Sequence, residues 1–383
     1  MIRKILSLSV VLALLGSGAW AQKSETIIPP YGADQECNRT DATYLCIPFD
    51  GSWEIVPFEF QLPDCYQNDD ASTAEIPLGF AFDLFGTQYT SLWINNNGNL
   101  SFDGPYGTFT PEGFPIVGFP MVAPFWGDVD TRSMESGAGA VWMKQGPNYL
   151  AVTWDHVGYF AVHTDLQNTF QVIISDGTYE PMGLGNNVCF CYGDMQWTTG
   201  DASGGVGGYG GAPATVGVNK GDGIDYFNIG RFDHSGSDYA GPGGVSGVDW
   251  LDYQHVCFNV SAETNQPPVP INFPAGNVIT AYVGQQLDLT VGFIGPEAGQ
   301  TVHTDVDPFG LANFSYISTD GNPSTVQMTF NPTAAQIGAY PVHFTATDDY
   351  NPAGVTEVDL RIIVEYPTPT EETSWGNIKS RFR

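Results

Sequence analysis

The feature that most constrains this chain is how often turn residues interrupt its apolar runs. Asn97-Gly98 and Asp176-Gly177 each follow a short β-rich run, and glycine and proline together make up about a fifth of the 383 residues. Asn-Gly and Asp-Gly favour the primed turns that join antiparallel strands, because both dipeptides tolerate positive φ. No amphipathic helix longer than three turns is visible. The sequence therefore predicts an all-β protein.

The cysteines and the prolines divide the chain into two parts. All six cysteines precede residue 258, and Asn265-Gln266-Pro267-Pro268 forms a polar, proline-bearing break. We expect one large β domain over residues 22–262, including an N-terminal cysteine-containing extension. A second domain over 266–366 has alternating runs typical of a β-sandwich. These runs are 278–282, 287–291, 325–330, 342–347 and 355–364.

The two ends of the chain resemble targeting segments. Two cations precede an apolar run from Ile5 to Leu15, and Ala19 and Ala21 place small residues before a cleavage site at Gln22. Residues 1–21 are therefore predicted to be a signal peptide, since the run is shorter than the roughly 20 residues that span a bilayer. No later stretch is long and apolar enough to span, so a secreted or extracellular protein is expected. The tail, 367–383, is interpreted as a frayed terminus or as a sorting or attachment signal to the cell surface.

Export changes the interpretation of the cysteines. An even number of cysteines outside the cytoplasm favours disulfides over catalytic thiols or zinc. Cys189 and Cys191 would face the same side of a strand, so each would need its own partner. A C-x-C metal site is the alternative. The pairing stays open among Cys37, Cys46, Cys65, Cys189, Cys191 and Cys257.

The charge limits the class of partner. The chain has 12 Lys and Arg against 42 Asp and Glu, for a net charge of −30. Such a surface repels phosphate backbones, which argues against binding to nucleic acid. Calcium, cationic partners and neutral glycans remain compatible with it.

Seven motifs of the first part lie at 78–82, 92–102, 121–132, 150–154, 170–175, 199–205 and 213–219, and together they cover about 75–230. In this order they resemble the NIDO family, the nidogen-like extracellular module of nidogen, tectorin, membrane mucins and exported bacterial proteins. The most distinctive is Pro124-Phe-Trp-Gly-Asp-Val-Asp130. The resemblance, of bacterial type, implies a β fold and a role in cell-matrix adhesion, with a matrix or surface protein or a glycan as partner. Residues 22–74 fall outside this pattern.

The second part has four further motifs, at 265–268, 284–289, 338–340 and 345–352. This pattern resembles the Ig-like and cadherin-like modules of bacterial surface proteins. It implies a spacer domain and, by analogy with cadherins, calcium bound by acidic residues near the joint. The full cadherin linker signature of alternating Asp and Asn is absent.

Acidic residues at two places make calcium a candidate cofactor. Asp128 and Asp130 alternate to one face of the NIDO-like run, where they would either pair with Arg132 or hold a cation. In the second part, Glu297 and two short acidic runs either supply carboxylate oxygens to calcium or are solvated loop acids. The candidate calcium ligands are Asp128, Asp130, Asp305, Asp307, Asp348 and Asp349.

No catalytic motif is present. There is no His-Glu-x-x-His and no Gly-x-Ser-x-Gly, and residues 200–205 fit a glycine-rich turn better than a protease nucleophile segment. Asp155-His156 is interpreted as a surface hydrogen bond. We expect a non-catalytic adhesion protein without catalytic or cofactor-binding residues. The alternative is a secreted carbohydrate-active protein, either a lectin or a glycoside hydrolase, because carboxylate pairs are numerous and their separation is invisible in sequence.

Overall fold

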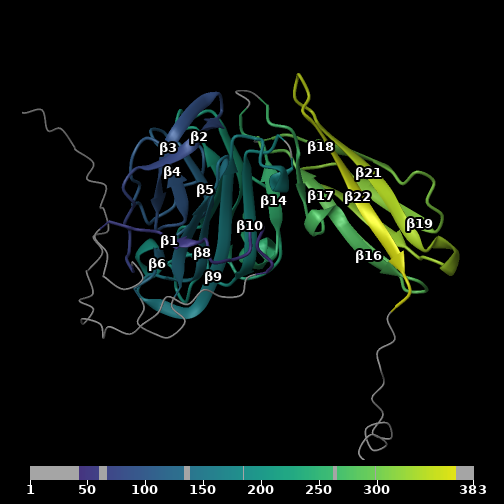
Figure 1. Ribbon diagram of the computed structural model, residues 1–383, viewed down its shortest axis with the longest axis horizontal. Coiled ribbons are helices and arrows are strands. Elements are labelled where there is room, and N and C mark those ends of the chain that lie inside the picture. The colour runs from purple at the N-terminus through teal and green to yellow at the C-terminus, as the bar shows by residue number, and fades with distance from the viewer. Residues whose placement is uncertain are drawn as a thin grey trace, which may run out of the picture. The chain divides into compact units, whose positions relative to one another are not determined.

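The structure is a computed structural model that describes residues 43–59, 67–132, 139–183, 185–261, 265–297 and 299–367 (Figure 1). The predicted signal peptide, Cys37, Cys65 and tail residues 368–383 lie outside the described residues. The prediction of an all-β protein is confirmed, because the described helices are 3-10 turns of three or four residues. No helix in the described ranges is long and apolar enough to span a membrane.

Residues 54–258 form two seven-stranded sheets, which we call the N-terminal sheet pair. The first sheet has the order β1-β7-β8-β9-β10-β14, and β6 pairs with β8. Its strands are β1 (Glu54–Ile55), β6 (Val129–Asp130), β7 (Ala140–Gln145), β8 (Tyr149–Tyr159), β9 (His163–Ser175), β10 (Val188–Met195) and β14 (His255–Phe258).

The second sheet has the order β13-β12-β11-β5-β4-β3-β2. Its strands are β2 (Ile76–Leu84), β3 (Thr87–Asn95), β4 (Asn99–Ser101), β5 (Met121–Trp126), β11 (Ala214–Asn219), β12 (Tyr226–His234) and β13 (Val245–Gly247). Strand β5 lies between β4 and β11, and all six of its residues are buried.

Large aromatic side chains fill the core between these two sheets. Phe125 on β5 packs against Phe170 on β9, with ring centroids 5.5 Å apart. Phe170 in turn stacks on Trp154 of β8 at 5.0 Å. Each of these side chains removes a large apolar area from water, which is the main favourable contribution to folding. The core therefore holds β5, the strand that carries the NIDO-like run, in a fixed position.

The two turn signals have different outcomes. Asn97-Gly98 lies in the short connection between the paired residues Asn95 and Asn99, so the predicted hairpin is confirmed. Gly98 has φ +79° but Asn97 does not have a positive φ, so the prediction of a primed turn is wrong. Asp176-Gly177 does not form a tight hairpin. Strand β9 pairs with β10 as expected, but residues 176–187 connect them, and η1 (Glu180–Met182) lies within that connection.

Residues 269–365 form two four-stranded sheets, which we call the C-terminal sheet pair. The orders are β15-β17-β20-β19 and β16-β22-β21-β18. The strands are β15 (Val269–Ile271), β16 (Val278–Tyr282), β17 (Leu287–Ile294), β18 (Val302–Asp307), β19 (Phe314–Thr319), β20 (Ser324–Phe330), β21 (Gly338–Asp348) and β22 (Val355–Glu365). Each of the five alternating runs falls within one of these strands. Over residues 342–348 of β21 and 358–364 of β22 every second side chain is buried, so the period of two places one face in a shared core.

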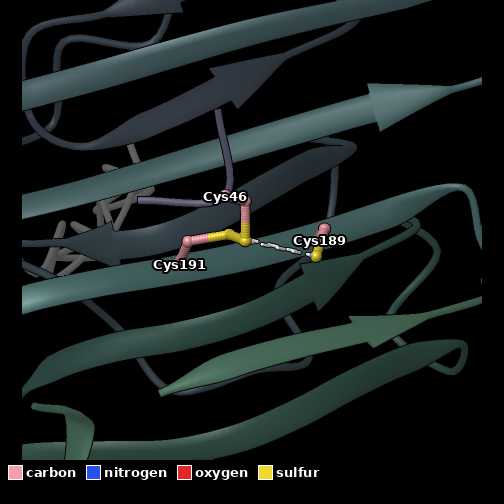
Figure 2. Close-up of side chains that lie close together, drawn as sticks. All are labelled: Cys46, Cys189 and Cys191. Atoms are coloured by element: carbon pink, nitrogen blue, oxygen red, sulfur yellow. Dashed lines mark hydrogen bonds between the residues drawn. A yellow bond between two sulfur atoms is a disulfide. The ribbon is translucent and has the colours of Figure 1, made fainter. Parts of the chain in front are cut away.

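Two disulfides link the described cysteines. Cys46 bonds to Cys191 and Cys189 bonds to Cys257, so neighbouring cysteines on β10 have separate partners, as predicted. Figure 2 shows the sulfur of Cys46 between those of Cys191 and Cys189. The alternative of a C-x-C metal site is wrong, because both thiols of that motif are consumed.

Candidate functional site

The distinctive run of residues 121–132 spans β5, a short bend and β6. Val129 and Asp130 of β6 pair with Tyr159 and Gly158 of β8, so the run crosses from one sheet to the other. All six residues of β5 are buried, and the two aspartates that follow it are buried as well. Both Asp128 and Asp130 are at most 1% exposed. A buried carboxylate requires charged or hydrogen-bonding partners.

Asp130 has such partners in Arg132. The guanidinium donates from Nε to Oδ1 at 2.9 Å and from Nη2 to Oδ2 at 2.6 Å, which is a bidentate ion pair. The backbone N–H groups of Arg132 and Val162 donate to the same carboxylate at 3.0 Å each. Both oxygens of Asp130 are thus engaged, and the expectation of an Asp–Arg network holds for this residue.

Arg132 also connects this network to the segment before β2. Its Nη2 lies 3.0 Å from Oδ2 of Asp69, and its guanidinium lies 5.7 Å from the ring centre of Phe160. Burial alone would lower the pKa of Arg132. The hydrogen bond to Asp130 and the charges of Asp130 and Asp69 outweigh that effect and raise the pKa. Arg132 therefore stays charged.

Asp128 belongs to a different group. Oxygen atoms of Asp69, Asp70 and Asp128, which we call the carboxylate cluster, all lie within 4.8 Å of one another. Asp69 is positioned by a β-bridge to Asp130, and Asp70 follows it with φ +65°. The two predicted ligands of this run thus separate, since Asp130 pairs with Arg132 while Asp128 faces the two preceding acids.

The turn between β3 and β4 reaches the same cluster. Nδ2 of Asn97 donates to Oδ1 of Asp70 at 2.7 Å, and the backbone N–H of Gly127 donates to Asn97 O at 3.2 Å. Asn97 is 1% exposed. The sequence places Asn97 in a turn of the NIDO-like motif 92–102 and predicts no ligand role for it, and it leaves Asp69 and Asp70 outside the family pattern. A pair of adjacent acids gave no signal by itself, because only the fold brings them to Asp128.

The candidates in the C-terminal sheet pair are spread over β18 and β21. Asp348 is buried and accepts hydrogen bonds from the backbone of Tyr350 and Gly354, whereas Asp349 is exposed and accepts from Thr301. Asp348 lies opposite Val302 at one end of β18. Asp305 and Asp307 are exposed farther along that strand. Among the described residues, the structure does not bring these four acids together.

Glu297 is the most perturbed acid of this region. Its Oε1 accepts a hydrogen bond from the backbone N–H of Gln266 at 2.6 Å, and burial raises the pKa of Glu297 to about 7. Nearby, Asn265 donates from Nδ2 to both oxygens of Asp348 at 3.1 and 3.2 Å. The linker residues are thus tied to acids of the C-terminal sheet pair.

The residues considered for catalysis have structural contacts. Asp155 is 2% exposed and bonds to Nδ1 of His156 at 2.7 Å, and this hydrogen bond raises the pKa of His156. The pair is therefore less exposed than the surface hydrogen bond that the sequence suggested. Residues 201–203 form a 3-10 turn ended by Gly204 in the left-handed region, as expected for a glycine-rich turn.

Two neighbouring loops of the second sheet each expose an apolar side chain. Val117 and Ile224 are each 76% exposed. A β-bridge joins Val117 to Asp222, and the N–H of Gly118 donates to Gly221 O at 2.7 Å. These hydrogen bonds hold both loop tips in place, so the two exposed apolar side chains stand on fixed backbone. We call Val117 and Ile224 the loop-tip pair.

The tryptophans contribute to the core. Trp126, Trp154 and Trp197 are fully buried, and none of the tryptophans in the described ranges is exposed. Sugar-binding sites commonly stack an aromatic ring against the sugar, and an exposed tryptophan would serve that purpose. The described part of the chain offers tyrosines at its surface but no such tryptophan.

Comparison with known proteins identifies the family. A family profile described as "NIDO related" matches residues 43–235. Human alpha-tectorin is 35% identical over 187 residues, which cover 42% of this chain and 8% of alpha-tectorin. Nidogen of Drosophila melanogaster is 26% identical over 161 residues, which cover 35% of this chain and 12% of nidogen. The chain thus corresponds to a small part of these relatives.

Solved structures resemble the chain only weakly. The BIgI domain of beta protein from S. agalactiae is 19% identical, with a TM-score of 0.18, and the match covers 24% of this chain and 92% of that domain. A score this low supports no argument. The family profile, by contrast, begins at residue 43, so the expectation that residues before 75 lie outside the pattern is wrong for 43–74. Because the profile matches just over half of the 383 residues, the chain belongs to the NIDO-related family.

Proposed function

We propose that this chain is a secreted, non-catalytic adhesion protein whose NIDO-related region binds a protein or glycan of the extracellular matrix or of a cell surface. Its relatives alpha-tectorin and nidogen are extracellular matrix proteins, and each is similar to this chain over less than half of its length. The two disulfides agree with an oxidising, extracellular location. The predicted signal peptide at 1–21 supports the same location.

The observation that carries the proposal is the loop-tip pair. An aliphatic side chain that is 76% exposed stays in contact with water, and two of them on adjacent loops form a surface that a partner can cover. Binding residues are often found on loops that a rigid scaffold positions. Here the scaffold is the second sheet, whose strands β11 and β12 flank the loop of Ile224.

The net charge of −30 restricts the partner. Like charges repel over several ångströms at physiological ionic strength, so a strongly acidic partner would be repelled. The favoured partner is a protein with a neutral or basic surface, or a neutral glycan. The chemistry of the loop-tip pair further favours an apolar patch on that partner.

The remaining parts receive supporting roles in this proposal. Residues 22–262 would be the bacterial-type NIDO domain with its cysteine-containing extension. Residues 266–366 would be an Ig-like or cadherin-like spacer, and 367–383 a tail that attaches the protein to the cell surface. The alternating strands of the C-terminal sheet pair support the Ig-like assignment, since this pattern is typical of β-sandwiches.

A binding array tests the proposal. The purified chain is applied to matrix proteins and glycans, and the double variant Val117→Ser/Ile224→Ser is compared with Val206→Ser. Val206 is 85% exposed on the turn of the Val206–Tyr209 bridge, so it controls for the loss of exposed apolar area in general. We expect the double variant to lose binding at least tenfold while Val206→Ser binds as the unchanged chain does. Equal binding by all three proteins would contradict the proposal.

The same preparation tests the carbohydrate-active alternative. The chain is incubated with a panel of polysaccharides, and reducing ends are measured over time. An adhesion protein leaves the polysaccharides intact, whereas a glycoside hydrolase releases new reducing ends. Release that scales with protein concentration would rule out a purely adhesive role.

A further inference from the structure

The carboxylate cluster has the spacing of a calcium site. Calcium is bound by oxygen atoms at about 2.3–2.6 Å, so two oxygens on one ion are separated by at most about 5 Å. The oxygens of Asp69, Asp70 and Asp128 lie within 4.8 Å of one another. One calcium ion can therefore contact all three carboxylates without a rearrangement of the backbone.

A second observation at the cluster is independent of the acids. Oδ1 of Asn97 is buried and accepts no hydrogen bond from the described residues. Its partner atom Nδ2 lies 2.7 Å from Asp70. A half-turn of the terminal amide exchanges the two atoms and directs Oδ1 at the cluster. An amide oxygen is a suitable calcium ligand, and binding would satisfy a buried acceptor that otherwise has none.

The backbone around the cluster is closely packed. A Cβ at Gly200 would lie 2.6 Å from Oδ2 of Asp128, so the absence of a side chain there makes room for the carboxylate. A Cβ at Gly107 would lie 2.5 Å from the carbonyl oxygen of Asp70. The two glycines thus leave room for Asp128 and Asp70 to lie as they do in the cluster.

We propose that Asp69, Asp70, Asp128 and Oδ1 of Asn97 bind one calcium ion. Asp130 is not part of this set, because Arg132 and Val162 engage both of its oxygens, whereas Arg132 lies against Oδ2 of Asp69. The ion would connect the segment before β2, the β3–β4 turn and the bend after β5. An all-oxygen donor set favours calcium over zinc, which prefers nitrogen and sulfur ligands. Extracellular calcium modules commonly have dissociation constants of about 0.1–1 mM.

Thermal unfolding followed by tryptophan fluorescence tests the proposal. The described tryptophans lie between Trp53 and Trp250, so their emission reports the N-terminal sheet pair rather than the C-terminal one. The purified chain is compared in 10 mM CaCl2 and in EDTA, with sodium chloride added to match the ionic strength. We expect calcium to raise the midpoint by about 3 °C or more. An unchanged midpoint would refute the site.

Three variants separate binding from structure. Asp128→Asn removes one ligand charge and should weaken calcium binding at least tenfold in calorimetric titration, whereas the exposed control Asp103→Asn should bind as the unchanged chain does. If Asp128→Asn does not fold, Asn97→Asp provides the test. The added carboxylate repels Asp70, so we expect a lower midpoint in EDTA and a larger rise with calcium. A decrease that calcium does not reverse, or undiminished binding by Asp128→Asn, would overturn the proposal.

Discussion

Gly98, in the turn that carries Asn97, provides a sharp test of how closely the two sheets are packed. Its φ is +79°, and a Cβ built there would lie 1.9 Å from the carbonyl oxygen of Phe125 and 3.2 Å from Cζ of Phe170. Alanine at positive φ costs about 1–2 kcal/mol. The close approach to β5 adds an overpacking cost of about 1–3 kcal/mol, because this strand is buried and cannot move aside easily.

Gly118 is a matched control for this substitution. It has φ +89°, but a Cβ there would meet no atom within 4 Å. Gly98→Ala and Gly118→Ala therefore share the cost of positive φ, and both reduce the entropy of the unfolded chain by a similar amount. The difference between the two variants isolates the contacts of the added methyl group with Phe125 and Phe170. We expect Gly98→Ala to lose about 1–3 kcal/mol more free energy of unfolding than Gly118→Ala.

Urea unfolding followed by tryptophan fluorescence measures this difference, because the seven described tryptophans, from Trp53 to Trp250, lie in or next to the N-terminal sheet pair. The midpoint should shift while the slope of the free energy against urea stays constant. If Gly98→Ala is too unstable to purify, its yield relative to Gly118→Ala replaces the midpoint. Equal free energies of unfolding for the two variants would show that β5 yields to the added methyl group, and the packing argument would be wrong.

Three further predictions concern other interactions of the fold. Cys46→Ser/Cys191→Ser opens a link between residues 145 positions apart and should lower the free energy of unfolding by up to about 5 kcal/mol; a urea-measured loss below about 1 kcal/mol would contradict this. Arg132→Met leaves the buried Asp130 without its bidentate partner and should cost about 3–5 kcal/mol in the same assay, much of which Asp130→Leu in the same chain should restore. Glu297 has its pKa raised from 4.5 to about 7 by burial, so the fold favours its neutral form; this stability is present below pH 4.5 and lost as the pH rises to 7. Glu297→Gln should therefore be more stable than the unchanged chain by about 2–3 kcal/mol at pH 8 and equally stable at pH 4. Calorimetry at both pH values measures the two stabilities, and EDTA in the buffer removes calcium as a variable.

Local patterns in the sequence are sufficient to predict the strands. The run 278–282 coincides with β16, and the run 355–364 lies within β22, because side chains alternate between core and solvent with the period of a strand. The same rule predicts that Cys189 and Cys191 share a face and need separate partners. Asn97-Gly98 predicts a hairpin connection because the tolerance of positive φ is a property of glycine and asparagine themselves. Each of these inferences depends on neighbours along the chain.

The partners across space depend on the tertiary structure. Asp128 and Asp130 are two residues apart, and the alternation rule places them on one face, yet one pairs with Arg132 and the other lies beside Asp69 and Asp70. The bend between β5 and β6 breaks the alternation, and the segment before β2 contributes acids from some 60 residues away. A sequence reports which side chains can hold a charge. Which charges meet in the interior is decided by the packing of two sheets, since strand pairing and register bring together residues that are far apart in the chain.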